Sequence, residues 1–355
     1  MRRSRIRPQS DATRGRRGTA IAVTLLGVVL LGALFVAGTG IFGTAQPSPT
    51  FHSAQPAHAS PTTSTDATES GAVVSASPAT PVPIPSPTAA PTTPALPALL
   101  GAIGDSYSQA WSVSPDYLYD HPQFSWVVGT DENDGVTSLL ERFRALGGSP
   151  AVADAATSGK KMNDALRQAN LVVAAAKKLA AGQTAYVTFE LGTNDICASP
   201  DFVTDPAVFA TQLQSAVGAL RAGLPAGSRI LMLPVPDFPH FRDITQASAA
   251  ARALLALPEN LNRCAPYEGT SSPSALVSAN DYLSQYDADL KTACDDIDAN
   301  EGATGALYCT YNAALLADSD FTIDDLSTFD YFHPSLSGQA KMAEDAWRAG
   351  VRGSV

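Results

Sequence analysis

The chain has 355 residues, enough for one or two domains, and a formal net charge of −11. The acidity is concentrated from residue 99 onward, where 16 Lys and Arg face 31 Asp and Glu. Binding a phosphate backbone needs clustered positive charge, so this composition argues against a nucleic-acid partner.

The first 45 residues have the pattern of a targeting segment. Residues 1–17 carry seven Arg and are predicted to form a basic cytoplasmic N-terminus, because positive charge stays inside. Residues 18–45 contain an uncharged apolar run at 19–36 that, with its continuation, exceeds the ~20 residues a helix needs to cross a bilayer. Its length favours a signal-anchor, and a cleaved signal peptide ending at Gly43-Thr44-Ala45 is the alternative. We therefore expect a single-pass protein of the cell membrane with an extracellular C-terminal domain, or a secreted protein if the segment is cleaved.

Residues 46–97 are predicted to be a disordered linker. They hold 12 of the 26 prolines, and Ser, Thr and Ala fill most of the rest. Such a segment cannot bury enough apolar surface to offset its ordering entropy, and its prolines favour an extended spacer.

Residues 98–355 are predicted to form one α/β domain. Apolar runs predict strands at 99–103, 151–155, 185–191 and 229–233. Helical patterns occupy 135–146 (with Asp134 as N-cap), 162–180, 207–224, 276–294 and 335–349. Alternation of this kind implies a parallel sheet with helices on both faces, with working groups at the carboxyl ends of the strands. The stretches 239–275 and 295–329 are interpreted as long insertions, and whether they form a lid is left open.

Three short polar motifs fall where predicted strands end or just before the last helix. Ser106 follows the first strand, and a sharp turn at Gly104 would present its hydroxyl at the edge of the sheet. Asn194 follows the strand at 185–191, and its amide is a donor suited to an oxyanion, so its removal is expected to slow turnover with little change in stability. Asp330 precedes His333 by three residues, which lets the carboxylate bond Nδ1 and leaves Nε2 to accept a serine proton.

Other histidines are given no catalytic role. Asp237 and His240 repeat the Asp-x-x-His spacing, but we interpret this copy as a loop. His121 is likewise assigned to a loop, and His52 and His58 lie in the linker.

Four cysteines lie in the predicted domain, and an even number in an exported chain predicts two disulfides. Three pairings are possible, and sequence order favours Cys197 with Cys264 and Cys294 with Cys309. No CxxC pair and no Asp-x-Asp-x-Asp-Gly loop is present in the sequence, so neither a zinc nor a calcium site is expected.

Gly-Asp-Ser near the start, Gly-x-Asn-Asp in the middle and Asp-x-x-His-Pro near the end, in that order, resemble the SGNH/GDSL hydrolases over about residues 99–350. The blocks at 124–133 and 136–139, and Cys197 directly after Asn194-Asp195-Ile196, look like the phospholipase B branch of that family. The resemblance implies a flavodoxin-like, three-layer α/β/α sandwich with a parallel sheet.

The resemblance also implies roles for five residues and no cofactor or metal. Ser106 would be the nucleophile, His333 the general base and acid, and Asp330 the residue that orients His333. The oxyanion hole would combine the backbone N–H groups of Ser106 and Gly159 with the Asn194 side chain. The reaction would be hydrolysis of a carboxylic ester through an acyl-enzyme.

The substrate is not fixed by these motifs. The phospholipase B resemblance favours a lipid ester, a phospholipid or lysophospholipid, and a polysaccharide O-acetyl ester is the alternative. A non-catalytic wall- or lipid-binding protein on the same scaffold is the alternative from another class. Tyr107 replaces the Leu of Gly-Asp-Ser-Leu and Thr193 replaces a Gly common before Asn-Asp, so both are expected to shape the acyl pocket. A monomer is favoured.

Overall fold

The structure is a computed structural model that describes residues 96–114, 119–197, 203–257, 260, 263–264, 266–267, 272–313 and 320–351. The predicted segments 1–17 and 18–45, and all of the predicted linker up to residue 95, lie outside these ranges. Within them, no helix has both the length and the apolar character needed to cross a membrane.

The centre of the fold is a five-stranded sheet in which every neighbouring pair is parallel. Its order is β2-β1-β3-β4-β5. The strands are β1 (Leu99–Ile103), β2 (Ala151–Asp154), β3 (Ala185–Phe189), β4 (Ser228–Met232) and β5 (Leu307–Tyr311). Strands β1 and β3 are buried along their whole length, which explains their continuous apolar runs. The predicted α/β fold with a parallel sheet is confirmed.

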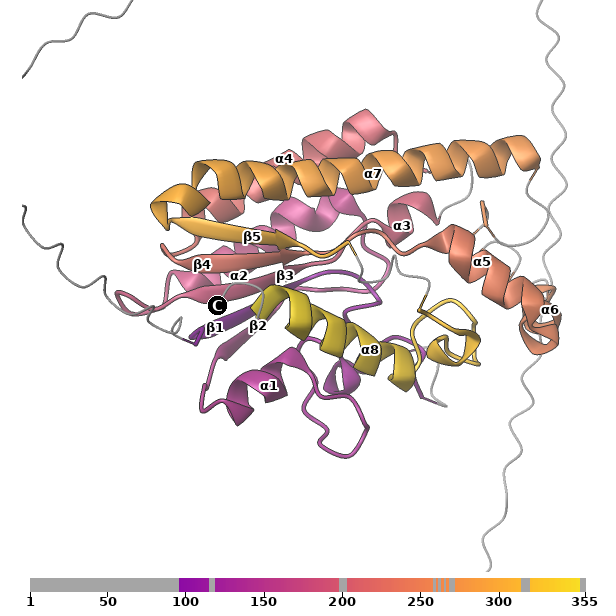
Figure 1. Ribbon diagram of the computed structural model, residues 1–355, viewed down its shortest axis with the longest axis horizontal. Helices are drawn as coiled ribbons and strands as arrows, with labels where there is room; N and C mark the ends of the chain where they lie inside the picture. The colour runs from indigo at the N-terminus through magenta and orange to yellow at the C-terminus, as the bar shows by residue number, and fades with distance from the viewer. Residues whose placement is uncertain are drawn as a thin grey trace, which may run out of the picture. The chain divides into compact units, whose positions relative to one another are not determined.

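Helices cover both faces of the sheet (Figure 1). One layer contains α2 (Ala165–Ala176), α4 (Pro206–Gly223) and α7 (Pro273–Asn300), with α4 in contact with both others. The other contains α1 (Leu139–Ala145) and α8 (Leu336–Ala346), joined by an ion pair between Arg142 and Glu344 at 2.7 Å. Three short helices lie near the carboxyl ends of the strands, namely α3 (Thr193–Ile196), α5 (Phe238–Ala247) and α6 (Ala249–Leu255). Single turns of 3-10 helix occur at Pro122–Phe124, Met162–Asp164, Gly302–Thr304 and Ile323–Asp325, and a π turn at Trp347–Val351.

Several predicted boundaries were wrong. Helix α1 begins at Leu139, because Ser138 and Glu141 form a capping box there, whereas Asp134 accepts the N–H of Val136 in a preceding turn. Helix α2 ends at Ala176 rather than 180, and α7 begins at Pro273 under the cap of Ser272. The stretch 295–329 is no insertion, since it contains the end of α7 and strand β5.

Two disulfides stabilise the sheet and its surroundings. Cys294 on α7 is bonded to Cys309 on β5, and Cys197 after α3 is bonded to Cys264. This is the pairing favoured by sequence order, and the described residues contain no free cysteine.

Candidate active site

The turn that carries Ser106 has no room for a side chain at Gly104. A Cβ there would lie 2.3 Å from Ser108 Oγ and 2.9 Å from Glu190 Oε2. The Gln168 side chain also exchanges two hydrogen bonds with the Gly104 backbone, at 2.8 and 2.9 Å. Glycine is therefore required where β1 ends, and the turn holds Ser106 at the carboxyl end of β1.

Ser106, His333 and Asp330 form one chain of contacts. Ser106 Oγ lies 2.9 Å from His333 Nε2, and His333 Nδ1 lies 2.8 Å from Asp330 Oδ2. Ser106 is 5% exposed, His333 7% and Asp330 0%. The structure thus brings Ser106 to His333 and Asp330 although 227 residues separate the serine from the histidine in the sequence.

The loop that carries the histidine is held by side-chain bonds to its backbone. Asp330 Oδ1 accepts the N–H groups of Phe332 and His333, both at 3.0 Å, and Tyr331 has a left-handed φ of 47°. Such a φ in a bulky residue costs about 1–2 kcal/mol, which surrounding contacts must offset. One of these is the Tyr107 hydroxyl, which donates to the Phe332 carbonyl at 2.8 Å.

Tyr107 and Thr193 therefore do not have the position expected from the sequence. Both are fully buried, so neither lines an open acyl pocket. Tyr107 instead anchors the Asp330–His333 loop, and its ring packs 5.7 Å from the His333 ring.

Asp330 is an anion in this setting. Burial alone would raise its pKa, but the neighbouring His333 and the hydrogen bonds from His333 and Phe332 outweigh burial and lower the pKa. A buried carboxylate facing Nδ1 fixes the tautomer in which Nε2 can accept a proton from Ser106.

Asn194 lies on α3, beyond the end of β3, and its amide is fully engaged. Nδ2 donates to Asp105 Oδ2 at 3.1 Å and to the Lys160 carbonyl at 3.0 Å. Both amide protons are therefore committed to protein acceptors, and donating to an oxyanion requires one of these bonds to exchange. The backbone N–H groups of Ser106 and Gly159 have no acceptor among the described residues, and Gly159 has a φ of 77°.

Three buried acids lie beneath the site. Burial raises the pKa of Asp105 to about 7, with a further rise from the charge of Asp195. Burial and the nearby Asp105 raise the pKa of Glu190 well above its usual range, and burial raises that of Asp195 to about 6. Asp105 accepts hydrogen bonds from the Tyr107 N–H and Asn194, which favour its charged form, whereas burial and the neighbouring Asp105 favour the protonated form of Glu190.

Sequence reasoning missed two members of this site. Glu190 accepts the Asp105 N–H at 3.2 Å and the Ser108 hydroxyl at 2.9 Å. Arg263 places Nη1 3.3 Å from Asp330 Oδ2. The only available signals were an acid at the end of an apolar strand and an Arg beside a cysteine, and neither is specific.

The second Asp-x-x-His is part of a helix, not the loop expected from the sequence. Asp237 caps α5 by accepting the backbone N–H of His240 at 3.0 Å, so it does not orient the ring. His240 Nε2 lies 2.7 Å from the Phe321 carbonyl. His121 is a buried loop residue, as expected.

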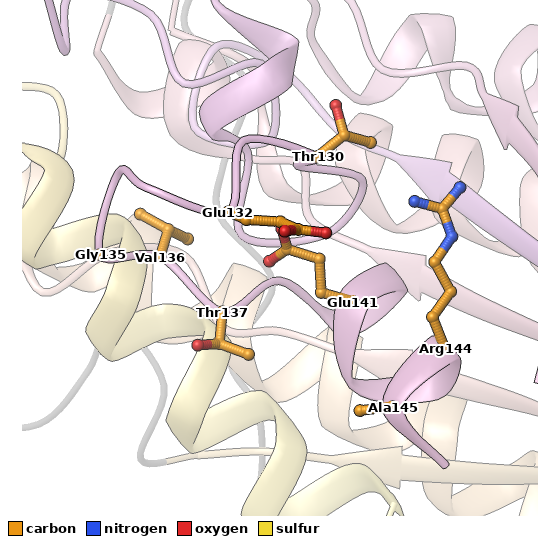
Figure 2. A pocket seen from close by; sticks show the side chains of 8 residues that line it. All are labelled: Thr130, Glu132, Gly135, Val136, Thr137, Glu141, Arg144 and Ala145. Carbon is orange, nitrogen blue, oxygen red and sulfur yellow. The ribbon is translucent and has the colours of Figure 1, made fainter. Parts of the chain in front are cut away.

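The described residues contain no group of three or more His, Cys, Asp or Glu that could hold a metal ion. A surface hollow of about 390 Å³ lies between the 130–137 loop and α1, and Figure 2 shows the side chains that line it. None of the predicted site residues borders it. Glu141, which lines the hollow, accepts the Ser138 N–H in the cap of α1.

A parallel α/β sheet with a serine, a histidine and a carboxylate joined at its carboxyl edge has the form of a carboxylic ester hydrolase. The chain belongs to the GDSL-like lipase/acylhydrolase family, whose model matches residues 100–346. Solved structures similar to it include TesA, at 20% identity over 70% of this chain and 96% of that chain, with a TM-score of 0.41. Another is the psychrotrophic esterase EstA from Pseudoalteromonas sp., at 16% identity over 71% and 96%, with a TM-score of 0.39. No protein with a curated function matches the sequence.

Proposed function

We propose that this protein is an exported ester hydrolase that uses Ser106, His333 and Asp330 in an acyl-enzyme mechanism on lipid acyl esters. The observation that carries the chemistry is the continuous set of contacts from Ser106 Oγ through the imidazole to a buried carboxylate. That arrangement is what nucleophilic catalysis by a weakly acidic hydroxyl requires.

In the first step His333 Nε2 takes the Ser106 proton as Oγ bonds to the ester carbonyl carbon. The imidazolium then gives that proton to the alcohol, whose C–O bond breaks, leaving the acyl group on Ser106. Water attacks the acyl carbonyl as His333 takes its proton. The bond to Ser106 Oγ then breaks, the imidazolium returns the proton to Oγ, and the carboxylic acid leaves. Asp330, held anionic, stabilises the imidazolium in both steps.

The oxyanion would be held by the backbone N–H groups of Ser106 and Gly159 and by Asn194. The two backbone donors have no acceptor among the described residues, which supports this role. Asn194 joins them when its bond to the Lys160 carbonyl is exchanged for one to the substrate, while its bond to Asp105 keeps the amide oriented.

A lipid substrate is supported by the phospholipase B-like block at 124–133. In the structure this block lies beneath the nucleophile turn, where Ser125 Oγ donates to the Ser108 carbonyl at 2.7 Å and Trp126 N–H to Gln339 at 2.9 Å. The basic and apolar N-terminal pattern supports export with retention at the cell membrane, or secretion after cleavage. Such a location would place the domain near its lipid.

The test is covalent labelling of the full-length chain, purified in detergent, with a fluorophosphonate probe and adduct mapping by mass spectrometry. The expected label is on Ser106 in the wild type and in Ser215→Ala, a change on the exposed face of α4, and is lost in Ser106→Ala and His333→Ala. A folded chain that takes no label would overturn the enzymatic proposal in favour of a lipid- or wall-binding protein.

The substrate is tested separately by hydrolysis of lysophospholipids and phospholipids in parallel with acetylated polysaccharide. Faster turnover of the long-chain lipid esters supports the proposal. Activity on acetyl esters alone would replace it with a polysaccharide O-acetyl esterase.

A further inference from the structure

Arg263 contacts the same carboxylate of the proposed triad as the histidine. Its Nη1 lies 3.3 Å from Asp330 Oδ2, the same oxygen that lies 2.8 Å from His333 Nδ1. The Arg263 side chain is 25% exposed and that of Asp330 is 0% exposed. One buried oxygen is therefore shared by a guanidinium and an imidazole.

The segment that carries Arg263 is attached to its surroundings at three points. Asn260 donates to the Leu254 carbonyl at 2.9 Å and accepts from Arg263 Nη2 at 2.5 Å. Cys264, the next residue, is bonded to Cys197. Tyr267 is buried, with its ring stacked 5.5 Å from that of Phe238 on α5.

The disulfide connects the two halves of the proposed site. Cys197 is the C-cap of α3, the short helix that carries Asn194. Cys264 adjoins Arg263, which bonds Asp330. The same covalent link thus holds the segment carrying the oxyanion donor and the segment carrying the partner of the triad acid.

We propose that Arg263 is a positioning residue of the ester hydrolase, which fixes Asp330 against His333 and is itself held in place by the Cys197–Cys264 disulfide. The inference rests on the proposed function of the triad. The fixed cation has two effects: it orients Oδ2, and it offsets part of the negative charge that Asp330 presents to the imidazole. The second effect favours the neutral, proton-accepting imidazole at lower pH.

The other ionisable groups around the pair are placed differently. The Tyr107 hydroxyl donates to the Phe332 carbonyl, and the Asp105 carboxyl faces Asn194. Arg242, Tyr267 and Tyr331 line a small aromatic cavity behind the loop together with Phe332. Among the arginines and lysines that the structure describes, Arg263 is the one that contacts the acid itself.

The test compares full-length wild type, Arg263→Gln, Arg263→Lys and a control, Arg221→Gln, on a p-nitrophenyl ester. Arg221 is a similarly exposed arginine on α4, paired with Glu301 away from the site. For Arg263→Gln we expect kcat/KM at pH 7 to fall roughly three- to tenfold. We also expect the acidic limb of its pH profile to move up by about 0.5–1 unit. Arg263→Lys should restore the position of the limb, and Arg221→Gln should match the wild type.

A second arm tests the tether. Cys264→Ser should lower kcat/KM and shift the acidic limb in the same direction as Arg263→Gln. The double variant should be little worse than either single variant, because both changes remove the same contact between Arg263 and Asp330. An unshifted acidic limb in a folded Arg263→Gln, or additive losses in the double variant, would overturn the inference. Wild-type turnover and labelling of Ser106 are measured first, so a chain without activity refutes the proposed function rather than the role of Arg263.

Discussion

Replacing Asn194 with Ala tests the oxyanion hole and the support beneath it in one variant. The lost donor is expected to lower kcat by roughly 10²–10³, the effect of removing one such group elsewhere. Sequence alone predicts little change in stability, but the structure shows two bonds from the amide, one to a buried carboxylate at 3.1 Å and one to a carbonyl at 3.0 Å. Losing both should cost about 2 kcal/mol of unfolding free energy, since the carbonyl can be rehydrated and Asp105 keeps the Tyr107 N–H.

The pH dependence of that cost gives the sharper assay. Burial raises the pKa of Asp105 to about 7, and the Asn194 bond favours its charged form. The stability loss in Asn194→Ala should therefore be larger at pH 8 than at pH 5. Melting temperature at both pH values, read beside kcat on a p-nitrophenyl ester, measures both effects, with a drop of roughly 4–8 °C expected at pH 8. Asn163→Ala, an exposed change ahead of α2, is the control. Unchanged kcat would reject the oxyanion role, and equal melting at both pH values would reject the coupling to Asp105.

Four further substitutions address other parts of the molecule. His333→Ala should abolish ester hydrolysis and His240→Ala should spare it, which a single-turnover assay distinguishes; the reverse pattern would mean that the other Asp-x-x-His is catalytic. Tyr107→Phe removes the bond to the Phe332 carbonyl and should cost about 1 kcal/mol in urea unfolding with a several-fold loss of kcat, and an unchanged kcat would show that the anchor is dispensable. Burial raises the pKa of Asp287 from 3.8 to about 7, so the folded state favours the protonated carboxyl. The free energy of unfolding is therefore unaffected by this group below about pH 4 and falls as pH rises through about 7. Asp287→Asn should then be more stable than wild type by ~1–2 kcal/mol at pH 8, after allowance for solvent screening, and no more stable at pH 4.

The sequence predicted best those strands and helices whose residues are all buried or follow one regular burial pattern. Strand β1 occupies the expected residues 99–103 because it is buried on both faces and bounded by Pro97 and Gly104. Strand β5 was missed because it is an edge strand with a mixed burial pattern, so LYCTY has no continuous apolar run. The start of α1 was misplaced because Asp134 and Ser138 are both capping residues, and only the capping box with Glu141 decides between them.

The residues of the site likewise differ in how far local sequence predicted them. Ser106, Asp330 and His333 were predictable because each belongs to a short motif in which neighbouring residues already indicate a catalytic role. Glu190 depends instead on sheet register: Ile103 pairs with Phe189, so the residues that follow the two strands meet, and the acid after β3 lies against the turn of the nucleophile. Arg263 depends on a disulfide that joins residues 67 positions apart. The catalytic residues could thus be identified from short local motifs. The residues that adjust the charge of the site are brought there by contacts between segments that are distant in the sequence.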